Sequence, residues 1–441
     1  MKKINFVLLP LVLISLIGCN NVSPTTTSES IDSSTIKITK FEERELPSPR
    51  TLIRNKEDLI YVLDYMSFYK LTNKVTLKIA EEYKDQVSNI KLEFNEAKEE
   101  SLISDVFHIA LDHSLYKDQG MISLELYSTV ISTDMSSGNL IPIRLDSFSY
   151  NLNKSEEELP LEHTNKGELH VSDSEQLYYA LCNNYLPIPS NKEMETLLNN
   201  IHEVLNLTYR STNSNFDNLK NIYDYLIHEV TYDKVASRYD DFDIYKNQSY
   251  YLEGVFNNHL AVCDGKAKAY VVLCSYIGIP NVRIRAIDEN LNKHAYNYVK
   301  LDDTWYLSDS TNGSKTFKIN QNTYQVPNYE MFLTSLETAY ESSWTYVSNM
   351  HTSILEKVSK TPYDYFKNEN LVISSYEEVK NLITTNLDRN NFSIEFQIEN
   401  QTLDILDAVQ RLDQELPSFT FEALQNMPKD EGIYTILIFK K

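Results

Sequence analysis

Cys263, His294 and Asp309 are three residues whose types and order could support nucleophilic chemistry. Cys263 begins a segment of small and apolar residues that ends at Gly278-Ile279-Pro280. Because glycine and proline end helices, this pattern predicts a helix that starts at Cys263. The positive end of the helix dipole would favour the thiolate there. A single cysteine in this position is also compatible with a small buried apolar side chain.

The segments that contain His294 and Asp309 predict a β-hairpin that turns at Asp302-Asp303. A two-residue turn pairs Leu301 with Thr304, and this register makes His294 and Asp309 diagonal neighbours on one face of the hairpin. Such neighbours lie ~7–8 Å apart at their Cα atoms, within reach of their side chains. A three-residue turn would place them on opposite faces. Taken separately, the two residues are also compatible with a core histidine and a solvated carboxylate.

The three residues together favour catalysis more than any one of them does. A thiolate nucleophile needs a base within hydrogen-bond reach, and the base needs an acceptor that orients it. A cysteine at a helix N-terminus, with histidine and aspartate on adjacent strands, supplies all three groups.

The residues around this triad resemble the bacterial transglutaminase-like superfamily, which shares a papain-like core. The family's three sequence blocks correspond here, in order, to Ala261-Val262-Cys263-Asp264-Gly265-Lys266-Ala267, to His294-Ala295-Tyr296-Asn297 and to residues 302–311. The resemblance covers roughly residues 215–335. It implies that Cys263 is the nucleophile, that His294 is the general base and acid, and that Asp309 orients His294.

Several neighbours of the triad depart from the family pattern. Lys266 and Tyr296 replace the usual aromatic and tryptophan residues, while Ala261 and Asp303 replace glycines. These departures leave the substrate preference open. We expect Lys266 on the exposed face of the helix.

An oxyanion hole requires two hydrogen-bond donors. The backbone N–H of Cys263 is one candidate. Papain-like enzymes add a side-chain amide a few residues upstream, where this sequence has Asn257 and Asn258. The sequence does not decide between them.

The N-terminal segment has the pattern of an export signal. Met1-Lys2-Lys3 precedes a short apolar run that ends at Leu16-Ile17-Gly18-Cys19, which is too short for a membrane-spanning helix. The ending resembles the lipobox of bacterial lipoproteins, and this resemblance implies a lipid on Cys19. We therefore expect a signal peptide over 1–18, a flexible tether over 19–48, and a protein anchored by lipid to the extracytoplasmic face of the cell membrane. An ordinary secretory signal with a chance cysteine is the alternative.

The composition limits the classes of partner. The 441-residue chain has 41 Lys and Arg residues against 63 Asp and Glu residues, so its net charge is −22. This balance argues against nucleic-acid binding, which needs a basic surface. The sequence contains none of the common zinc-hydrolase, nucleotide-binding or dinucleotide-binding motifs, and we expect neither a metal nor a cofactor.

The pattern along the chain predicts an α+β fold, in which a papain-like transglutaminase core has its cysteine helix packed on an antiparallel sheet and is flanked by small α+β modules. We expect an N-terminal module at 49–155, the transglutaminase-like domain with a short leading strand and helix at 165–350, and a C-terminal module at 365–441. Residues 375–379 align with 55–59, and a third partial copy begins near 171. These similarities indicate a repeated module, although strand–cap–helix starts also resemble one another for physical reasons alone. Within the N-terminal module we expect mostly helix up to about residue 111 and a strand at 141–145.

The sequence therefore predicts a membrane-anchored extracytoplasmic lipoprotein with a cysteine-dependent acyl-transfer domain. Its expected substrates are peptide or protein amides, including cell-wall peptides. Whether the enzyme would hydrolyse them or cross-link them stays open. The alternative is a catalytically idle module that binds peptides or the cell wall with the same groove.

Overall fold

The computed structural model of the chain describes residues 46, 48–71, 73–104, 107–127, 167–238, 247–287, 293–319, 322–337, 352–363, 365–388, 392–399, 403–425 and 432–441. Four sequence predictions lie outside these residues: the signal peptide, the lipid attachment at Cys19, nearly all of the tether and the strand at 141–145.

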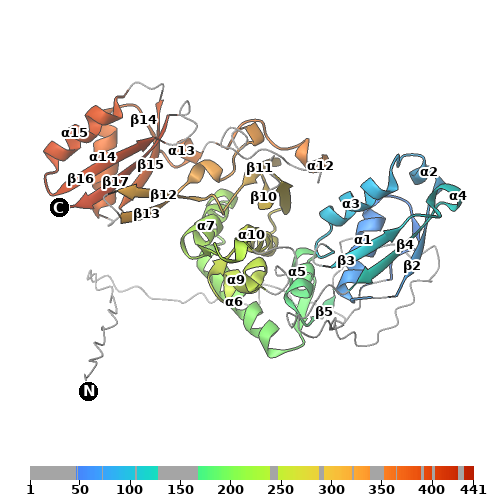
Figure 1. Cartoon of the computed structure of the whole chain (residues 1–441). Helices are drawn as coiled ribbons and strands as arrows, with labels where there is room; N and C mark the ends of the chain where they lie inside the picture. The colour runs from blue at the N-terminus through green and yellow to red at the C-terminus, as the bar shows by residue number, and fades with distance from the viewer. Residues whose placement is uncertain are drawn as a thin grey trace, which may run out of the picture. The chain divides into compact units, whose positions relative to one another are not determined.

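A four-stranded sheet near the N-terminus forms with its helices the blue and cyan part of Figure 1. Its strands, in spatial order, are β1 (Leu52–Ile53), β2 (Val75–Ile79), β4 (Met121–Tyr127) and β3 (His108–Asp112). Its helices are α1 (Lys56–Phe68), α2 (Glu81–Lys84), α3 (Ile90–Glu100) and α4 (Tyr116–Gln119). The side chain of Asn55 accepts a hydrogen bond from the backbone of Asp58 and caps α1, as their spacing predicts. The prediction of helix up to residue 111 is wrong, because His108–Asp112 pairs with β4 as a strand.

The C-terminal sheet has the same topology. Its strands, in spatial order, are β14 (Val372–Ile373), β15 (Ser393–Ile398), β17 (Ile433–Lys440) and β16 (Phe419–Gln425), with helices α14 (Tyr376–Asp388) and α15 (Ile405–Glu415). In each sheet the first two strands are parallel and the other two pairs are antiparallel. The aligned segments 55–59 and 375–379 both begin the helix that follows the first strand. A third strand–helix–strand unit consists of β5 (Glu168–Val171), α5 (Ser174–Cys182) and β6 (Leu186–Pro189).

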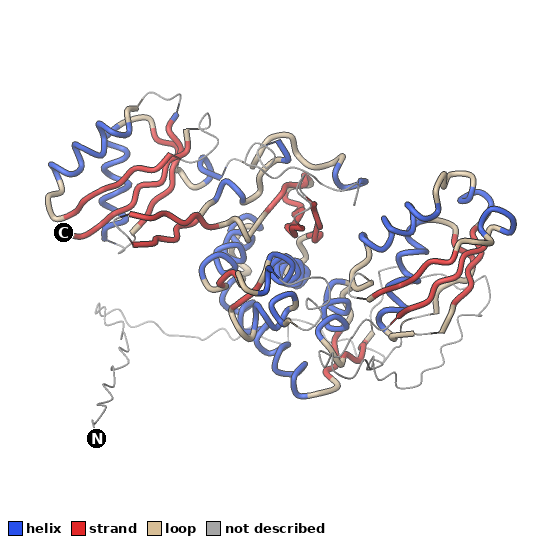
Figure 2. Tube along the Cα trace, viewed as in Figure 1, coloured by secondary structure: helices blue, strands red, loops and turns tan. Residues whose placement is uncertain are grey.

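The central part of the chain has helices around a short antiparallel sheet (Figure 2). The helices are α6 (Lys192–Thr208), α7 (Asn215–His228), α9 (Leu252–Phe256) and α10 (Cys263–Tyr276). The sheet has the order β11 (Thr304–Ser308), β10 (Lys293–Leu301) and β9 (Asn281–Ile287), and a separate parallel pair consists of β7 (Thr231–Tyr232) and β8 (Leu260–Ala261). Residues 265–274 of α10 are all buried, because the helix packs against β9 and β10 as well as against α5, α7 and α9.

The ends of α10 and the hairpin that follows match the sequence prediction. The helix begins at Cys263, and Gly278 has a left-handed backbone (φ 74°) just after it ends. In the hairpin Leu301 pairs with Thr304, and both turn residues, Asp302 and Asp303, have positive φ. Two such residues define the tight turn that suits the twist of paired strands.

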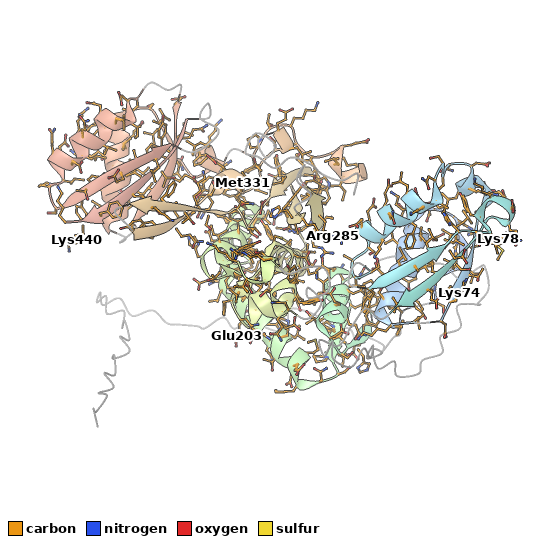
Figure 3. All side chains as sticks on the ribbon, viewed as in Figure 1. Lys74, Lys78, Glu203, Arg285, Met331 and Lys440 are labelled. Carbon is orange, nitrogen blue, oxygen red and sulfur yellow. The ribbon has the colours of Figure 1, made fainter. Side chains whose placement is uncertain are left out.

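Figure 3 shows all described side chains, including those of the remaining elements. These elements are η1 (Ala236–Arg238), η2 (Gln248–Tyr250), β12 (Ser314–Ile319), β13 (Asn322–Pro327), η3 (Tyr329–Met331), α12 (Thr352–Leu355) and α13 (Tyr365–Asn368).

Candidate active site

Cys263 occupies the first turn of α10 with its side chain half-buried. The residue before it, Val262, is extended (φ −87°, ψ −179°), and no side chain caps this helix N-terminus. The positive end of the helix dipole therefore acts on the thiol with no side chain capping the helix, while the one acid of the first turn, Asp264, pairs with Arg283 and Lys268.

A close backbone contact fixes where this helix begins. The N–H of Val262 donates a hydrogen bond to the Ser249 carbonyl at 3.0 Å. A methyl group at Gly265 would collide with the same carbonyl oxygen. Glycine at 265 is thus what allows η2 to lie against the first turn of α10, next to Cys263.

His294 and Asp309 form a hydrogen-bonded pair. His294 Nε2 lies 2.8 Å from Asp309 Oδ2, and the two side chains are only 10% and 3% exposed. The ladder between β10 and β11 ends at Asn297 and Ser308, so Asp309 follows the last strand residue directly. The predicted register holds up to this last pair, and the side chains of His294 and Asp309 meet just beyond it.

The Asp309 carboxylate has further donors around it. Its Oδ1 accepts the backbone N–H of Thr311 at 2.9 Å and that of Asn312 at 3.2 Å, and its Oδ2 accepts the Asn312 side-chain amide at 2.7 Å. Burial alone would raise the pKa of Asp309, but His294 and Asn312 lower it below its usual range. Asn312 was not identified from the sequence, although an amide three residues after the aspartate is a usable signal.

The third member of the group is in contact with His294. Burial alone would lower the pKa of His294, but the Asp309 charge and hydrogen bond, together with a hydrogen bond to the Cys263 side chain, raise it to about 10. Since Nε2 faces Asp309, Nδ1 is the ring nitrogen available to the sulfur. The structure thus brings together Cys263, His294 and Asp309, with His294 between the other two. This is the arrangement that an activated thiol nucleophile requires.

Tyr232 is a neighbour of this group that the sequence analysis missed. It pairs with Ala261 across β7 and β8, two residues before Cys263, and its side chain is half-buried. Burial is the main cause that raises the pKa of Tyr232 to about 12, followed by the charge of Cys263; a hydrogen bond with Ser237 opposes this rise, and Asp309 contributes less to it. The hydroxyl is therefore neutral near pH 7, and the Cys263 charge acts on it. Its position in a short strand after α7, directly before Asp233, gave no chemical signal in the sequence.

The two asparagines considered for the oxyanion hole have other partners. Asn257 Oδ1 accepts a hydrogen bond from Asn200 at 2.9 Å, and Asn258 Nδ2 donates to Gln248 at 2.9 Å. Both residues are exposed. Neither side chain has a hydrogen bond with Cys263, His294 or Asp309, so the structure supports neither as the oxyanion donor.

The expectation that Lys266 is exposed is wrong. Its side chain is 4% exposed, and Nζ donates a hydrogen bond to the Leu226 carbonyl in the last turn of α7 at 2.9 Å. This carbonyl has no partner within its own helix, so the lysine satisfies it. Burial lowers the pKa of Lys266 to about 8, against the opposing effect of the Asp309 charge.

A cluster of ion pairs, separate from the His294–Asp309 pair, begins at the residue after Cys263. Asp264 bonds Arg283 at 2.6 Å and Lys268 at 3.1 Å, and Lys268 also lies 3.1 Å from Glu175 in α5. From β10, the Asn297 side chain donates to the Ala267 carbonyl of α10 at 3.0 Å. These contacts tie α10 to α5, β9 and β10, and they restrict its movement relative to the hairpin that contains His294.

No group of three or more His, Cys, Asp and Glu side chains among the described residues has an arrangement that could hold a metal ion. No helix in this part of the chain is long and apolar enough to cross a membrane.

Comparisons with known proteins identify a family for part of the chain. The family described as the transglutaminase-like superfamily matches residues 204–310, a range that includes all three triad residues. No curated protein matches the chain. Among solved structures, one match is a protein from Cytophaga hutchinsonii provisionally described as a cysteine protease, with 13% identity, a TM-score of 0.21, and coverage of 27% of this chain and 43% of that one. Another is the crystal structure of a TGase, with 14% identity, a TM-score of 0.25 and coverage of 59% of each chain.

The chain thus spans less than two thirds of the length of either solved structure. Residues 204–310 form a transglutaminase-like superfamily domain within a mixed α+β chain that has several small sheets, and the predicted fold class is confirmed.

Proposed function

We propose that the domain catalyses cysteine-dependent acyl transfer on peptide or protein amides. Cys263 is the nucleophile, His294 the general base and acid, and Asp309 the residue that orients His294. The observation that supports this most directly is the 2.8 Å distance between His294 Nε2 and Asp309 Oδ2. The other ring nitrogen, Nδ1, is available to the thiol at the start of α10.

In the first half of the reaction the thiolate of Cys263 attacks the amide carbonyl carbon and a C–S bond forms. The negative charge moves to the carbonyl oxygen, where the backbone N–H of Cys263 and the Tyr232 hydroxyl are the two candidate donors. The imidazolium of His294 then donates its proton to the leaving nitrogen. The C–N bond breaks, and an amine leaves with a thioester on Cys263.

In the second half, water or an amine attacks the thioester. Neutral His294 accepts the proton of the attacking group, the C–S bond breaks and the thiolate returns. Attack by water makes the enzyme a peptidase or amidase, whereas attack by an amine makes it a transglutaminase. Throughout the cycle the ionised Asp309 stabilises the charged imidazole and keeps its Nε2 proton directed toward the carboxylate.

The proposal includes the place where this reaction occurs. The Leu16-Ile17-Gly18-Cys19 sequence supports export, removal of residues 1–18 and lipid attachment at Cys19. The domain would then act at the extracytoplasmic face of the cell membrane, on surface proteins or on cell-wall peptides.

The test is to incubate the mature protein with a glutamine-containing peptide and a primary amine, and to analyse the products by mass spectrometry. Deamidation or cleavage of the peptide identifies hydrolysis, and incorporation of the amine identifies transfer. Both products should disappear in Cys263→Ala and persist in Cys182→Ala, since Cys182 is a free cysteine on α5. Peptide binding without any covalent product would favour the catalytically idle module instead.

A further inference from the structure

Asp309 begins a short loop, residues 309–313, that connects β11 to β12 and that we call the Asp309 loop. Both ends of this loop bond to the segment that follows β13. The N–H of Asp309 donates to the carbonyl of Met331, a residue labelled in Figure 3, at 2.9 Å. The carbonyl of Gly313 accepts the N–H of Asn328 at 2.8 Å. The position of the loop therefore depends on a segment that comes later in the sequence.

Asn328 makes a second contact with the Asp309 loop. The residue is only 4% exposed, and its Nδ2 donates to the carbonyl of Asn312 at 2.9 Å. Together with its backbone N–H on Gly313, Asn328 thus holds two consecutive carbonyl groups of the loop. Asn328 also occupies the N-cap position of η3, yet its side chain makes no capping hydrogen bond there. The amide is therefore directed at the loop rather than at its own helix.

Helix α7 also contacts the Asp309 loop. The hydroxyl of Tyr223, a fully buried residue, lies 3.2 Å from the backbone carbonyls of both Asp309 and Asn328 and can donate to either. A methyl group at Gly313 would collide with Ile227 and with the same hydroxyl. Because the packing leaves no space even for a methyl group, the loop has little freedom to shift.

The amide that this arrangement positions shares an oxygen atom with His294. Asn312 Nδ2 lies 2.7 Å from Asp309 Oδ2, and His294 Nε2 lies 2.8 Å from the same oxygen. Hydrogen bonds to a carboxylate stabilise its negative charge. An oxygen that accepts from two donors bonds each of them less strongly than it would bond one. The Asn312 amide therefore weakens the bond from His294, and with it the stabilisation of the imidazolium.

Other titratable groups lie close to this pair, but in the described part of the chain the shared oxygen accepts hydrogen bonds only from His294 and Asn312. These groups are Cys263 and Lys266 of α10, Tyr223 of α7, Tyr232 of β7 and Tyr296 of β10. The residue opposite His294 on β9 is Ala286, which does not titrate. Burial holds the pKa of Tyr223 well above its usual value and raises that of Tyr232 to about 12, so both hydroxyls stay neutral while a histidine titrates.

We propose that Asn328 is a positioning residue for acyl transfer, because it holds Asn312 where its amide limits how strongly Asp309 stabilises the charged form of His294. In the second half of the reaction, neutral His294 must accept a proton from water or an amine. Without the competing amide the imidazole would stay charged to higher pH, and less of the neutral base would exist. This role in turnover rests on the proposed function, whereas the effect on His294 can be measured without turnover.

The test is a titration of His294 by ¹⁵N NMR of the whole protein, in a Cys263→Ala background that removes the thiolate. His294→Gln identifies the signal. We expect Asn312→Ala to raise the pKa of His294 by roughly half to one pH unit, because Asp309 then stabilises the imidazolium more strongly. Lys266, whose pKa is about 8, is present in every variant, so its titration affects all curves alike. An unchanged pKa of His294 would overturn the proposal.

Asn328→Ala tests whether the effect passes through Asn312. It should also raise the pKa of His294, and the double variant should titrate as Asn312→Ala alone does, since residues that act through one contact are not additive. Additive shifts would contradict the positioning role. Asn312 is half-buried and its backbone N–H still bonds Asp309, so Asn312→Ala should fold even where Asn328→Ala does not.

The matched control is Gln325→Ala. Gln325 is an exposed amide on β13 that donates to Ser314 Oγ at 2.7 Å, so its removal should leave the titration of His294 unchanged. A shift in this control as large as that in Asn312→Ala would also contradict the proposal.

The same variants with Cys263 intact connect the titration to turnover. The pH at which hydrolysis of the thioester reaches half its maximal rate should move upward in Asn312→Ala by the same amount as the titration, and should not move in Gln325→Ala. A shifted titration with an unshifted rate profile would contradict the positioning role. A wild-type protein that forms no covalent product would instead contradict the proposed function.

Discussion

At the scale of single residues, the Asp309 carboxylate is the group at which a small chemical change should affect catalysis most. Asp309→Asn is nearly isosteric, but an amide can donate where His294 and three nearby N–H groups all require an acceptor. The comparable change in serine-hydrolase triads costs about 10⁴-fold in kcat, and a thiol depends less on its base, so we expect a loss on the order of 10²–10³-fold. The measurement is turnover together with thermal melting.

The control for this substitution is Asp303→Asn. Asp303 is the second turn residue of the same hairpin, and its side chain is 97% exposed, so the same chemical change there should leave turnover intact. Asparagine also tolerates the positive φ of this position. Normal turnover in a folded Asp309→Asn would show that Asp309 is only a structural carboxylate.

Lys266 makes a prediction about stability. Because its pKa is about 8 in the fold and near 10.5 in an unfolded chain, its burial costs on the order of 3 kcal/mol at neutral pH, whereas the Leu226 hydrogen bond returns about 1 kcal/mol. This cost is fully present below pH 8 and disappears as the pH rises toward 10.5. Lys266→Met should therefore raise the melting temperature at pH 7, with a smaller difference from the wild type at pH 10. A lower melting temperature at pH 7 would mean that the buried ammonium stabilises the protein.

At the scale of elements, the start of α10 depends on close contact with η2. Gly265→Ala places a methyl group against the Ser249 carbonyl, and we expect this overpacking to cost about 1–3 kcal/mol and to slow labelling of Cys263 by displacing the helix N-terminus. Gly278→Ala is the matched control, since no atom lies near its Cβ position. It should cost only the strain of a positive φ, about 1 kcal/mol, and leave labelling unchanged. Equal labelling in both variants would show that the contact does not position the thiol.

Most elements near the site could be predicted from the sequence because their signals are local. The glycine and proline after α10 and the two aspartates of the hairpin turn set boundaries and register without reference to the rest of the chain. The strand at His108–Asp112 was missed because its alanine and leucine also favour helix, while its pairing with β4 is a tertiary interaction. The partner of Lys266 is the Leu226 carbonyl, 40 residues away, and no local pattern reveals such a contact.

At the scale of the whole molecule, the transglutaminase-like domain comes, along the sequence, between two sheets of identical strand order. The sequence predicted this repetition from short aligned segments. The roles of Tyr232 and Asn312 could not be predicted from the sequence. Each role depends on contacts that exist only in the folded chain.

The lipid anchor gives a prediction at this scale. Cys19→Ala removes the thiol that would accept the lipid, so labelled fatty acid should no longer enter the protein, and the product should be an uncleaved precursor or a soluble form. Cys182→Ala is the control, and it should be labelled normally. A Cys19→Ala protein that is still processed and lipid-labelled would exclude the lipobox.

The central claim is that Cys263 is an activated thiol, and the most direct test is its rate of iodoacetamide labelling between about pH 6 and pH 9, read by peptide mass spectrometry. Burial raises the pKa of both Cys182 and Cys274 to about 12, so hardly any thiolate exists at these two residues near neutral pH. With His294 beside it, Cys263 should react at least about tenfold faster than either at pH 7. Equally slow labelling of all three cysteines would contradict the account.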